Sequence, residues 1–432
     1  MKILLVAKHS IVEPLGILFL ASVLKKQGHR VDVFLMNGAG ICNKEYDFVG
    51  FSTYTGFHRQ VFNLCKLLSQ SKVIIGGPHA TFFSDDCLAY ASRVVVGEGL
   101  RSILSAINSG PGVFFDSQLV SPEEIPIPDR EPLYSSYPSF PSNPIKNVMA
   151  SFGCPYTCSY CYNDSYKKLY SDFRVRYRTV KSVIEECQQL KKYSLKLIFF
   201  EDDCFGADLN WLREFSYDYE RLVGVPFHCQ IRPEMSSNER LRLLKSAGCQ
   251  GVTLAIETYR EDVRKDILNR NYSNKDIYSA CAEIKKLGMK LRTEQMLGIP
   301  NTTLEDELNL LRMNIEIKPD IAWTSTYTPY LGTTLGDWCK ENKWYNGSND
   351  DLENSFFSDS KINFMNGRAK KTNVLQRIFS TCAKIPQGNI LAKKFLNSEN
   401  YNFDSWFSNM RTHLYDYCLY STRVPAAKRV EV

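Results

Sequence analysis

The stretch SFGCPYTCSYCYND, residues 151–164, places Cys154, Cys158 and Cys161 within eight positions. Three thiolates are one ligand short of a closed tetrahedral zinc site, and an odd number cannot pair completely as disulfides. A C-x-x-x-C-x-x-C loop can gather three thiolates on one side of an iron–sulfur cluster, for which thiolate is the preferred ligand. In a four-iron cluster one iron then lacks a protein ligand. The spacing therefore predicts a cluster with one position open to a small molecule.

Zinc is the alternative metal for this loop, because structural zinc ions bind cysteine and histidine. No residue near the loop supplies a fourth ligand at finger-like spacing, and His228 and Cys229 lie far along the chain. A chance gathering of structural cysteines is the second alternative. Neither explains why three thiolates stand together with one ligand missing.

The other cysteines lack the spacing of ligands. Free cysteine packs as a small hydrophobe, so we expect these residues in the core or at the surface and find no second cluster among them. They are Cys42, Cys65, Cys87, Cys187, Cys204, Cys229, Cys249, Cys281, Cys339, Cys382 and Cys418.

The composition is that of a globular protein, since 44% of the 432 residues are hydrophobic and 23% are charged. This length allows two or three domains. The net charge of +6 is spread along the chain without a basic stripe, so we expect no nucleic-acid partner. No apolar run reaches the roughly 18–20 residues that cross a bilayer. Because MKILLVAKHS (1–10) predicts a strand rather than a secretion signal, we expect a cytoplasmic protein without a membrane partner.

Short apolar runs alternate with helix-like stretches over the first hundred residues. The strand-like runs are 2–7, 31–36, 47–53, 72–77 and 93–99. This alternation predicts a doubly wound, Rossmann-like parallel sheet. Ligands of such sheets bind outside the carboxyl ends of the strands, which places Ser52 to Gly56, GGPHA (76–80) and GEG (97–99) on the binding rim.

This region resembles the cobalamin-binding domain in front of many radical SAM enzymes. The matching pieces are PLGILFLASVLKKQGHRVDVF (14–34), DFVGFSTYTGFHRQ (47–60), VIIGGPHAT (73–81) and VVVGEG (94–99). The stretch 37–46 is too short for the usual helix, and the Asp-x-His-x-x-Gly signature of cobalt-ligating relatives is missing. A front domain that only packs against the catalytic one is the alternative. The resemblance implies cobalamin contacts by Ser52, Thr53, Tyr54, Thr55, Gly76, Gly77, Pro78, His79, Gly97, Glu98 and Gly99.

The rest of the chain divides into three parts, after a front domain of residues 1–120. Residues 121–145 are rich in Pro, Ser and Tyr and predict an extended linker. Residues 146–335 alternate strand-like and helix-like stretches about six times, which predicts a partial (β/α)6 barrel with its chemistry at the carboxyl ends of the strands. Residues 336–432 predict a mainly helical accessory subdomain, with helices at 372–385, in parts of 388–396 and in parts of 404–420. Capping of the substrate pocket is the alternative role for its aromatic residues, which are Trp338, Trp344, Phe356, Phe357, Trp406 and Tyr415.

The cysteine spacing, with Tyr160 before the last cysteine, resembles that of the radical SAM superfamily. Three further motifs follow in the family order: FFEDDCF (199–205), AIETYREDVRKDILNR (255–270) and MLGIP (296–300). The resemblance covers residues 1 to about 335. It implies a [4Fe–4S] cluster on Cys154, Cys158 and Cys161, whose open iron is chelated by S-adenosylmethionine (SAM). One-electron cleavage of SAM then yields a 5′-deoxyadenosyl radical, a chemistry that the cofactor supplies and the protein directs.

The resemblance also implies which residues contact SAM. They are Tyr160, Asp202, Asp203, Glu257, Thr258, Arg270, Gly298, Ile299 and Pro300. Glu257 and Thr258 fit contacts to the ribose or carboxylate, and Arg270 fits the arginine that pairs with the methionine carboxylate. The alternatives are a helix cap for Asp202 and Asp203, a solvated helix end for Arg270, and a plain strand turn for Gly298. Arg232, at the end of the third strand, is expected to face the site.

The resemblance implies a cobalamin-dependent enzyme that transfers a methyl group to an unactivated carbon or phosphorus of a small molecule. Its electron would come from an external one-electron donor such as flavodoxin or ferredoxin. Radical rearrangement, cyclisation or oxidation, with or without cobalamin, is the alternative chemistry. The transfer-RNA methylthiotransferases usually carry three more cluster cysteines and a small RNA-binding domain, for which this sequence has no match. A non-catalytic iron–sulfur protein that carries electrons or senses redox state is the alternative of another class.

Overall fold

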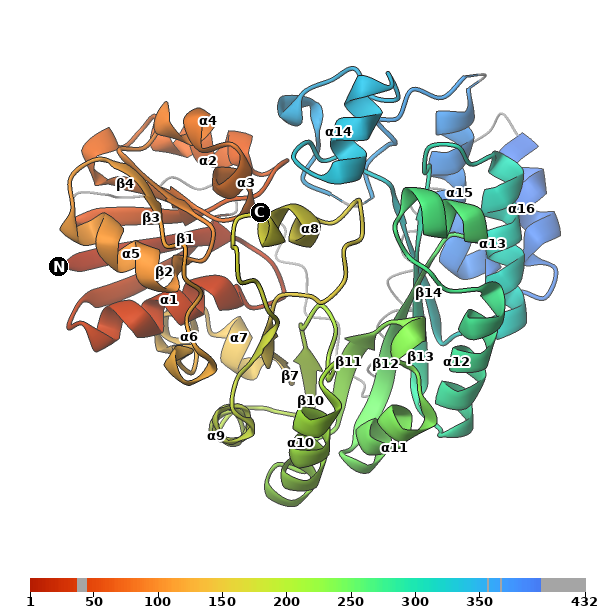
Figure 1. The fold of residues 1–432 in the computed structure, drawn as a ribbon, viewed down its shortest axis with the longest axis horizontal. Coiled ribbons are helices and arrows are strands. Elements are labelled where there is room, and N and C mark those ends of the chain that lie inside the picture. The colour runs from red at the N-terminus through yellow and green to blue at the C-terminus, as the bar shows by residue number, and fades with distance from the viewer. Residues whose placement is uncertain (37–44, 356, 366, 398–432) are drawn as a thin grey trace.

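Two six-stranded parallel sheets organise the chain, one within residues 2–115 and the other within residues 145–326. The computed structural model describes residues 1–36, 45–355, 357–365 and 367–397. In Figure 1 the first sheet and its helices are red and orange, the second sheet is green, and α8 (Tyr162–Lys167) lies between them. Among the described helices, none is long and apolar enough to cross a membrane.

The first sheet confirms the predicted doubly wound fold. Its strands stand in the order β2 (Arg30–Met36), β1 (Lys2–Lys8), β3 (Phe48–Ser52), β4 (Val73–Gly76), β5 (Arg93–Val96) and β6 (Gly112–Phe115). One face packs against α1 (Leu15–Lys26) and α5 (Gly99–Asn108). The other packs against α2 (His58–Cys65), α3 (Pro78–Phe82) and α4 (Ser84–Leu88). Because both faces are covered, the strands are apolar runs. Strand β2 lies on one side of β1 and β3 on the other, so the direction of the strand order reverses between β1 and β3. Ligands of such sheets bind at this switch point.

Two features of the front region differ from the sequence prediction. Strand β6 was not predicted, because it has only four residues and alternates half-buried with exposed positions. The prediction of an extended linker is wrong for residues 131–142, which form α6 (Glu131–Ser136) and α7 (Ser139–Ser142). Pro132 occupies the first turn of α6, where a missing N–H costs little. The apolar side chains of these helices then pack into the core beneath α1. The short stretch 37–46, predicted to lack a helix, falls mostly outside the described residues.

The second sheet confirms the predicted partial barrel. Its strands follow chain order: β7 (Ile145–Val148), β10 (Leu197–Phe200), β11 (Phe227–Ile231), β12 (Cys249–Glu257), β13 (Lys290–Leu297) and β14 (Ile321–Thr326). The helices between them are α9 (Val180–Leu190), α10 (Leu209–Leu222), α11 (Asn238–Ser246), α12 (Asn274–Lys286) and α13 (Leu304–Ile317). Several begin with Ser, Thr or Asp side-chain caps, as α10 does at Asp208. A small hairpin of β8 (Ser151–Phe152) and β9 (Arg176–Tyr177) adjoins the barrel.

A buried ionic network joins the two sheets through the linker. Arg130 forms ion pairs of 2.7 Å with Glu13, after β1, and with Glu186 on α9. It also donates to the Asn147 carbonyl at 2.6 Å. Tyr134 donates to Glu13 at 2.5 Å. The network therefore ties the front domain, the linker and the barrel together through buried contacts.

The described part of the C-terminal region is mainly helical, as predicted, with α14 (Thr334–Glu341), α15 (Arg368–Cys382) and α16 (Gly388–Asn397). Trp338 and Trp344 pack with Ile299 and Tyr327 in one apolar cluster beside the barrel, which supports the accessory packing role. Figure 1 shows α14 above the gap between the two sheets and α15 and α16 outside β14. Several predictions fall outside the described residues: the helix at 404–420 and the positions of Phe356, Trp406, Tyr415, Cys42 and Cys418.

Candidate functional site

The three-cysteine loop lies at the carboxyl end of β7 and ends in α8. Cys154 and Cys158 are buried, and Cys161 is partly exposed. The loop is fixed in its middle: the Ser159 backbone N–H donates to the Leu268 carbonyl at 3.2 Å, and the Ser159 carbonyl accepts from Leu335 at 2.8 Å. The sequence thus folds the thiols into the mouth of the barrel.

The end of the second barrel strand holds both sides of this loop. Asp202 is fully buried and accepts from the Ala150 N–H at 3.0 Å and the Ser151 hydroxyl at 2.5 Å. Burial raises the pKa of Asp202 to about 6. Asp203 accepts from the Asn163 side chain at 3.0 Å, in the first turn of α8. The alternative of a helix cap for these two acids is wrong, because α10 is capped by Asp208.

Cys204 lies next to a cluster cysteine, although it stood among the cysteines without ligand spacing. Its Sγ is 3.8 Å from Cys154 Sγ, and both residues are buried. This thiol contact lowers the pKa of Cys154. The same contact, with burial, raises the pKa of Cys204. No role was predicted for Cys204, although its position directly after Asp202 and Asp203, at the end of a barrel strand, could have indicated that it lies near the site.

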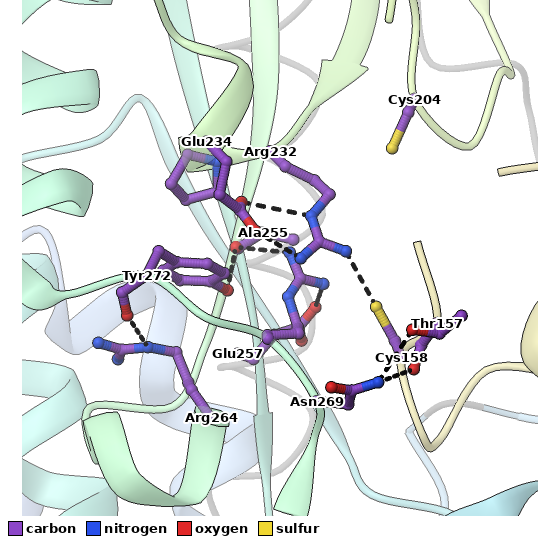
Figure 2. A network of polar contacts seen from close by, with 12 residues as sticks. Thr157, Cys158, Cys204, Arg232, Glu234, Ala255, Glu257, Arg264, Asn269 and Tyr272 are labelled. Carbon is purple, nitrogen blue, oxygen red and sulfur yellow. Dashed lines mark hydrogen bonds and ion pairs between the residues drawn. The ribbon is translucent and has the colours of Figure 1, made fainter. Parts of the chain in front are cut away.

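Arg232 faces the site, as predicted, and contacts a second cluster cysteine. Its Nη1 donates to Cys158 Sγ at 3.0 Å, and its Nη2 pairs with Glu234 at 2.6 Å. The guanidinium carbon lies 3.6 Å from the centroid of the Tyr156 ring. Figure 2 shows Arg232 between Glu234 and Cys158. Stacking and pairing together hold the cation in one orientation.

Three predicted SAM residues meet in a buried cluster next to the loop. Arg270 donates to Glu257 at 2.5 Å and to the Tyr160 hydroxyl at 2.7 Å, and that hydroxyl donates to Glu257 at 2.6 Å. Arg270 is 4% exposed, so the alternative of a solvated helix end is wrong. Glu257 has a φ of +68° at an irregularity in the pairing of β12 with β13. Such a φ is uncommon outside glycine and turns this carboxylate toward Arg270.

The segment after Glu257 is held by hydrogen bonds from two of its side chains, Arg264 and Asn269. The Thr258 carbonyl accepts a hydrogen bond from Arg264, whose guanidinium also donates to Asn274 at 2.7 Å. Arg264 belongs to a π-helical turn, Val263–Ile267. Asn269, with a φ of +52°, then donates to the Thr157 carbonyl at 2.8 Å. This turn therefore carries Arg270 and Asn269 back onto the cysteine loop.

The GIP segment lies at the end of β13, under the C-terminal region. The Gly298 N–H donates to the buried carboxylate of Glu307 at 2.9 Å. Arg368 and Thr372, both of α15, bind the same carboxylate at 2.8 and 2.9 Å. Gly298 has a φ of +76°, which favours glycine, and Ile299 and Pro300 are buried. The strand end is thus built into the core rather than a plain turn.

The predicted cobalamin residues follow β3, β4 and β5 at the carboxyl edge of the first sheet. Thr53 and His79 are fully buried there, and neither Thr53 Oγ1 nor His79 Nε2 has a hydrogen-bond partner. His79 Nδ1 contacts the Thr55 hydroxyl at 2.9 Å. Burial lowers the pKa of His79 to about 3, so the ring is neutral. Two unpartnered polar atoms on adjoining loops suit a ligand with polar groups.

Several rim residues also contact the chain itself. A Cβ added at Gly77 would lie 2.5 Å from the Thr53 carbonyl oxygen, and one at Gly97 would lie 2.3 Å from the Tyr170 hydroxyl. Gly99 packs against Leu20 of α1, and Gly76 against Val95. Glu98 binds Arg176 of the barrel hairpin at 2.5 Å. The carboxyl edge of the first sheet therefore meets the barrel beside the cysteine loop.

A strap of residues 349–354 crosses this rim, which sequence analysis did not predict. Asp350 pairs with the buried His58 at 2.8 Å. Asn354 accepts from the Tyr54 hydroxyl at 2.7 Å and from Lys8 at 2.8 Å. Two other rim residues stand at element ends: Ser52 is the last residue of β3, and Pro78 is the first residue of α3. The C-terminal region thus touches both the front domain and the barrel.

The residues of the cysteine loop fit the predicted iron–sulfur cluster. The cysteine loop offers three thiolates, the ligands that iron–sulfur clusters prefer. Burial raises the pKa of Cys161 to about 12. In the described part of the chain, no three His, Cys, Asp or Glu side chains are arranged to hold a single metal ion.

Comparison with known proteins finds two known domains in the chain. The family model of the Radical SAM superfamily matches residues 148–313, and that of a B12 binding domain matches residues 1–104. The chain is 24% identical over 367 residues to an uncharacterized methyltransferase of Pyrococcus horikoshii, covering 76% of this chain and 79% of that protein. It is 25% identical over 301 residues to the anaerobic magnesium-protoporphyrin IX monomethyl ester cyclase of Rubrivivax gelatinosus, covering 61% of this chain and 53% of the cyclase.

A solved structure shares the whole architecture. The cobalamin-dependent S-adenosylmethionine radical enzyme OxsB, determined with aqua-cobalamin and SAM bound, matches with a TM-score of 0.67 and 14% identity. The match covers 96% of this chain and 71% of OxsB. At this identity it shows the fold alone.

The chain thus carries a radical SAM domain with a B12-binding domain in front of it. It is a radical SAM enzyme. Its domains imply a [4Fe–4S] cluster, SAM and cobalamin as cofactors.

Proposed function

We propose that this enzyme transfers a methyl group to an unactivated carbon or phosphorus atom of a small molecule, using SAM and cobalamin. One observation carries the proposal. The carboxyl edge of the first sheet meets the barrel beside the three cysteines, through Glu98, Arg176 and Tyr170. A cofactor on that rim and one at the cysteine loop would face a common interface. The methyltransferase name of the Pyrococcus relative supports the same chemistry.

The residue roles follow from this placement. Cys154, Cys158 and Cys161 would hold the cluster, and Arg270 is the buried cation available to a SAM carboxylate. Glu257 and Tyr160, which now bind Arg270, would orient it and accept or donate hydrogen bonds to SAM. When bound, the cluster and SAM supply one-electron radical chemistry and cobalamin carries the methyl group. The chain's own part is to hold these groups in a buried site that excludes water.

The proposed domains are a B12-binding domain (1–120), a linker (121–145), the radical SAM barrel (146–335) and a helical accessory region (336–432). On the rim, Thr53 and His79 are the proposed polar contacts to cobalamin, because each has an unpartnered buried atom. The electron would come from an external flavodoxin or ferredoxin.

The test is anaerobic purification from cobalamin-supplied cells, with iron, cobalt and 5′-deoxyadenosine measured. We expect about four irons per chain, cobalt near one per chain, and SAM cleavage. Cys158→Ala should lose the cluster absorbance and SAM cleavage. Cys281→Ala removes a buried thiol of α12 outside the site and should retain both. Full iron and cleavage in Cys158→Ala would refute the site.

Radical cyclisation or rearrangement without methyl transfer is the second candidate. The cyclase relative, which matches 61% of this chain, favours it. The two candidates differ in their need for a methyl carrier. Iron without cobalt, and no uptake of cobalamin on reconstitution, would favour the second candidate and leave the front domain with a packing role only.

A further inference from the structure

Two side chains outside the cysteine motif contact cluster thiols. Arg232 Nη1 lies 3.0 Å from Cys158 Sγ, and Cys204 Sγ lies 3.8 Å from Cys154 Sγ. They come from the ends of β11 and β10, whereas the thiols come from the loop after β7. Figure 2 shows the contact between Arg232 and Cys158.

Both side chains are buried, and neighbouring groups hold Arg232 in place. Arg232 is 5% exposed, pairs with Glu234 at 2.6 Å, and stacks on Tyr156. A planar guanidinium fixed in this way loses little entropy when it donates a hydrogen bond. Cys204 is 4% exposed and lies two residues after Asp202, which accepts a hydrogen bond from the Ala150 N–H before the cysteine loop. Arg232 therefore cannot turn away from Cys158 without breaking its contacts with Glu234 and Tyr156.

We propose that Arg232 and Cys204 set the reduction potential of the cluster by donating hydrogen bonds to two of its three thiolates. This inference rests on the cluster site of the proposed function. Reduction transfers one electron from a low-potential donor to the cluster, with no proton, so the cluster gains one negative charge. Hydrogen bonds to the sulfurs and nearby positive charge stabilise the more negative state and raise the potential. The charged donor Arg232 has the larger effect and the neutral thiol of Cys204 the smaller one.

The experiment is an anaerobic redox titration followed by electron paramagnetic resonance, with iron counted in every sample. Arg232→Gln keeps an amide donor but removes the charge, and Arg232→Lys keeps the charge. Cys204→Ala removes the donor, and Cys204→Ser restores one. Arg213→Gln removes an exposed charge on α10 and serves as the control.

We expect midpoint potentials in the order wild type above Cys204→Ala above Arg232→Gln, all with full iron. Arg232→Lys should lie closer to the wild type than Arg232→Gln, and Cys204→Ser should lie near the wild type. Arg213→Gln should not shift. A potential unchanged in Arg232→Gln or in Cys204→Ala, at full iron, would overturn the proposal.

Two further results would also overturn it. An equal shift in Cys204→Ser and Cys204→Ala would mean that Cys204 acts through packing. Loss of iron in Cys204→Ala would make Cys204 a ligand instead of a donor. A wild-type protein that binds no cluster would refute the proposed function itself, which the iron count separates from an unchanged potential.

Discussion

Arg130→Met should destabilise the fold strongly, because Arg130 joins the front domain, the linker and the barrel. The side chains of Arg130, Glu13 and Glu186 are 7%, 2% and 1% exposed. Removing one partner of a buried ion pair costs about 3–5 kcal/mol, since it leaves a buried charge uncompensated. Here Glu13 keeps the Tyr134 hydroxyl at 2.5 Å, and Glu186 keeps its pair with Arg178. We therefore expect a loss of about 3–5 kcal/mol in total rather than for each carboxylate.

The assay is equilibrium unfolding in urea, followed by tryptophan fluorescence on chains stripped of cofactors, because bound ligands would shift the apparent stability. The matched control is Arg221→Ala, whose partner Asp218 lies 3.1 Å away on the surface of α10. Exposed pairs contribute about 0–1 kcal/mol. A loss in Arg130→Met no larger than in Arg221→Ala would refute the reasoning, and would mean that the linker network does not hold the two domains.

Three other perturbations test the site and its supports. Gly77→Ala should destabilise the fold by more than about 1 kcal/mol, because its φ is +99° and the new Cβ would lie 2.5 Å from the Thr53 carbonyl oxygen. Gly16→Ala, which meets open space, should not destabilise it, and urea unfolding curves of both variants check this. The pKa of His228 is lowered to about 3 by burial, so only the unfolded chain binds this proton between pH 6.5 and 3. Stability should therefore fall by about 1.4 kcal/mol per pH unit relative to His228→Gln as pH drops through that window, and parallel pH profiles would disprove it. Asp202→Ala leaves two buried donors unpaired, which should cost about 1–3 kcal/mol and lower iron occupancy; unchanged iron and stability would contradict this.

Local patterns in the sequence were sufficient for the elements and their order. The apolar run of residues 2–7 predicted a strand buried on both faces, and it lies within β1 (Lys2–Lys8). The cysteine spacing needs no tertiary information, because all three thiols lie on one loop. The motif glycine Gly298 adopts the positive φ that glycine permits. Short elements escaped prediction: β6 and the helices of residues 131–142 have too few residues for a periodic pattern.

The surroundings of the cysteines were decided by tertiary structure alone. Cys204 reaches Cys154 from 50 residues away, Arg232 reaches Cys158 from 74, and Asp350 reaches His58 from 292. Periodicity reports which face of an element is apolar, but not which strand ends meet at the mouth of a barrel. The sequence by itself therefore determined the three-cysteine loop, the doubly wound sheet and the partial-barrel sheet. Only the folded chain decided which side chains surround the thiols. Folding brings the carboxyl ends of six parallel strands to one edge of the partial barrel, and Arg130 joins the front domain to that barrel.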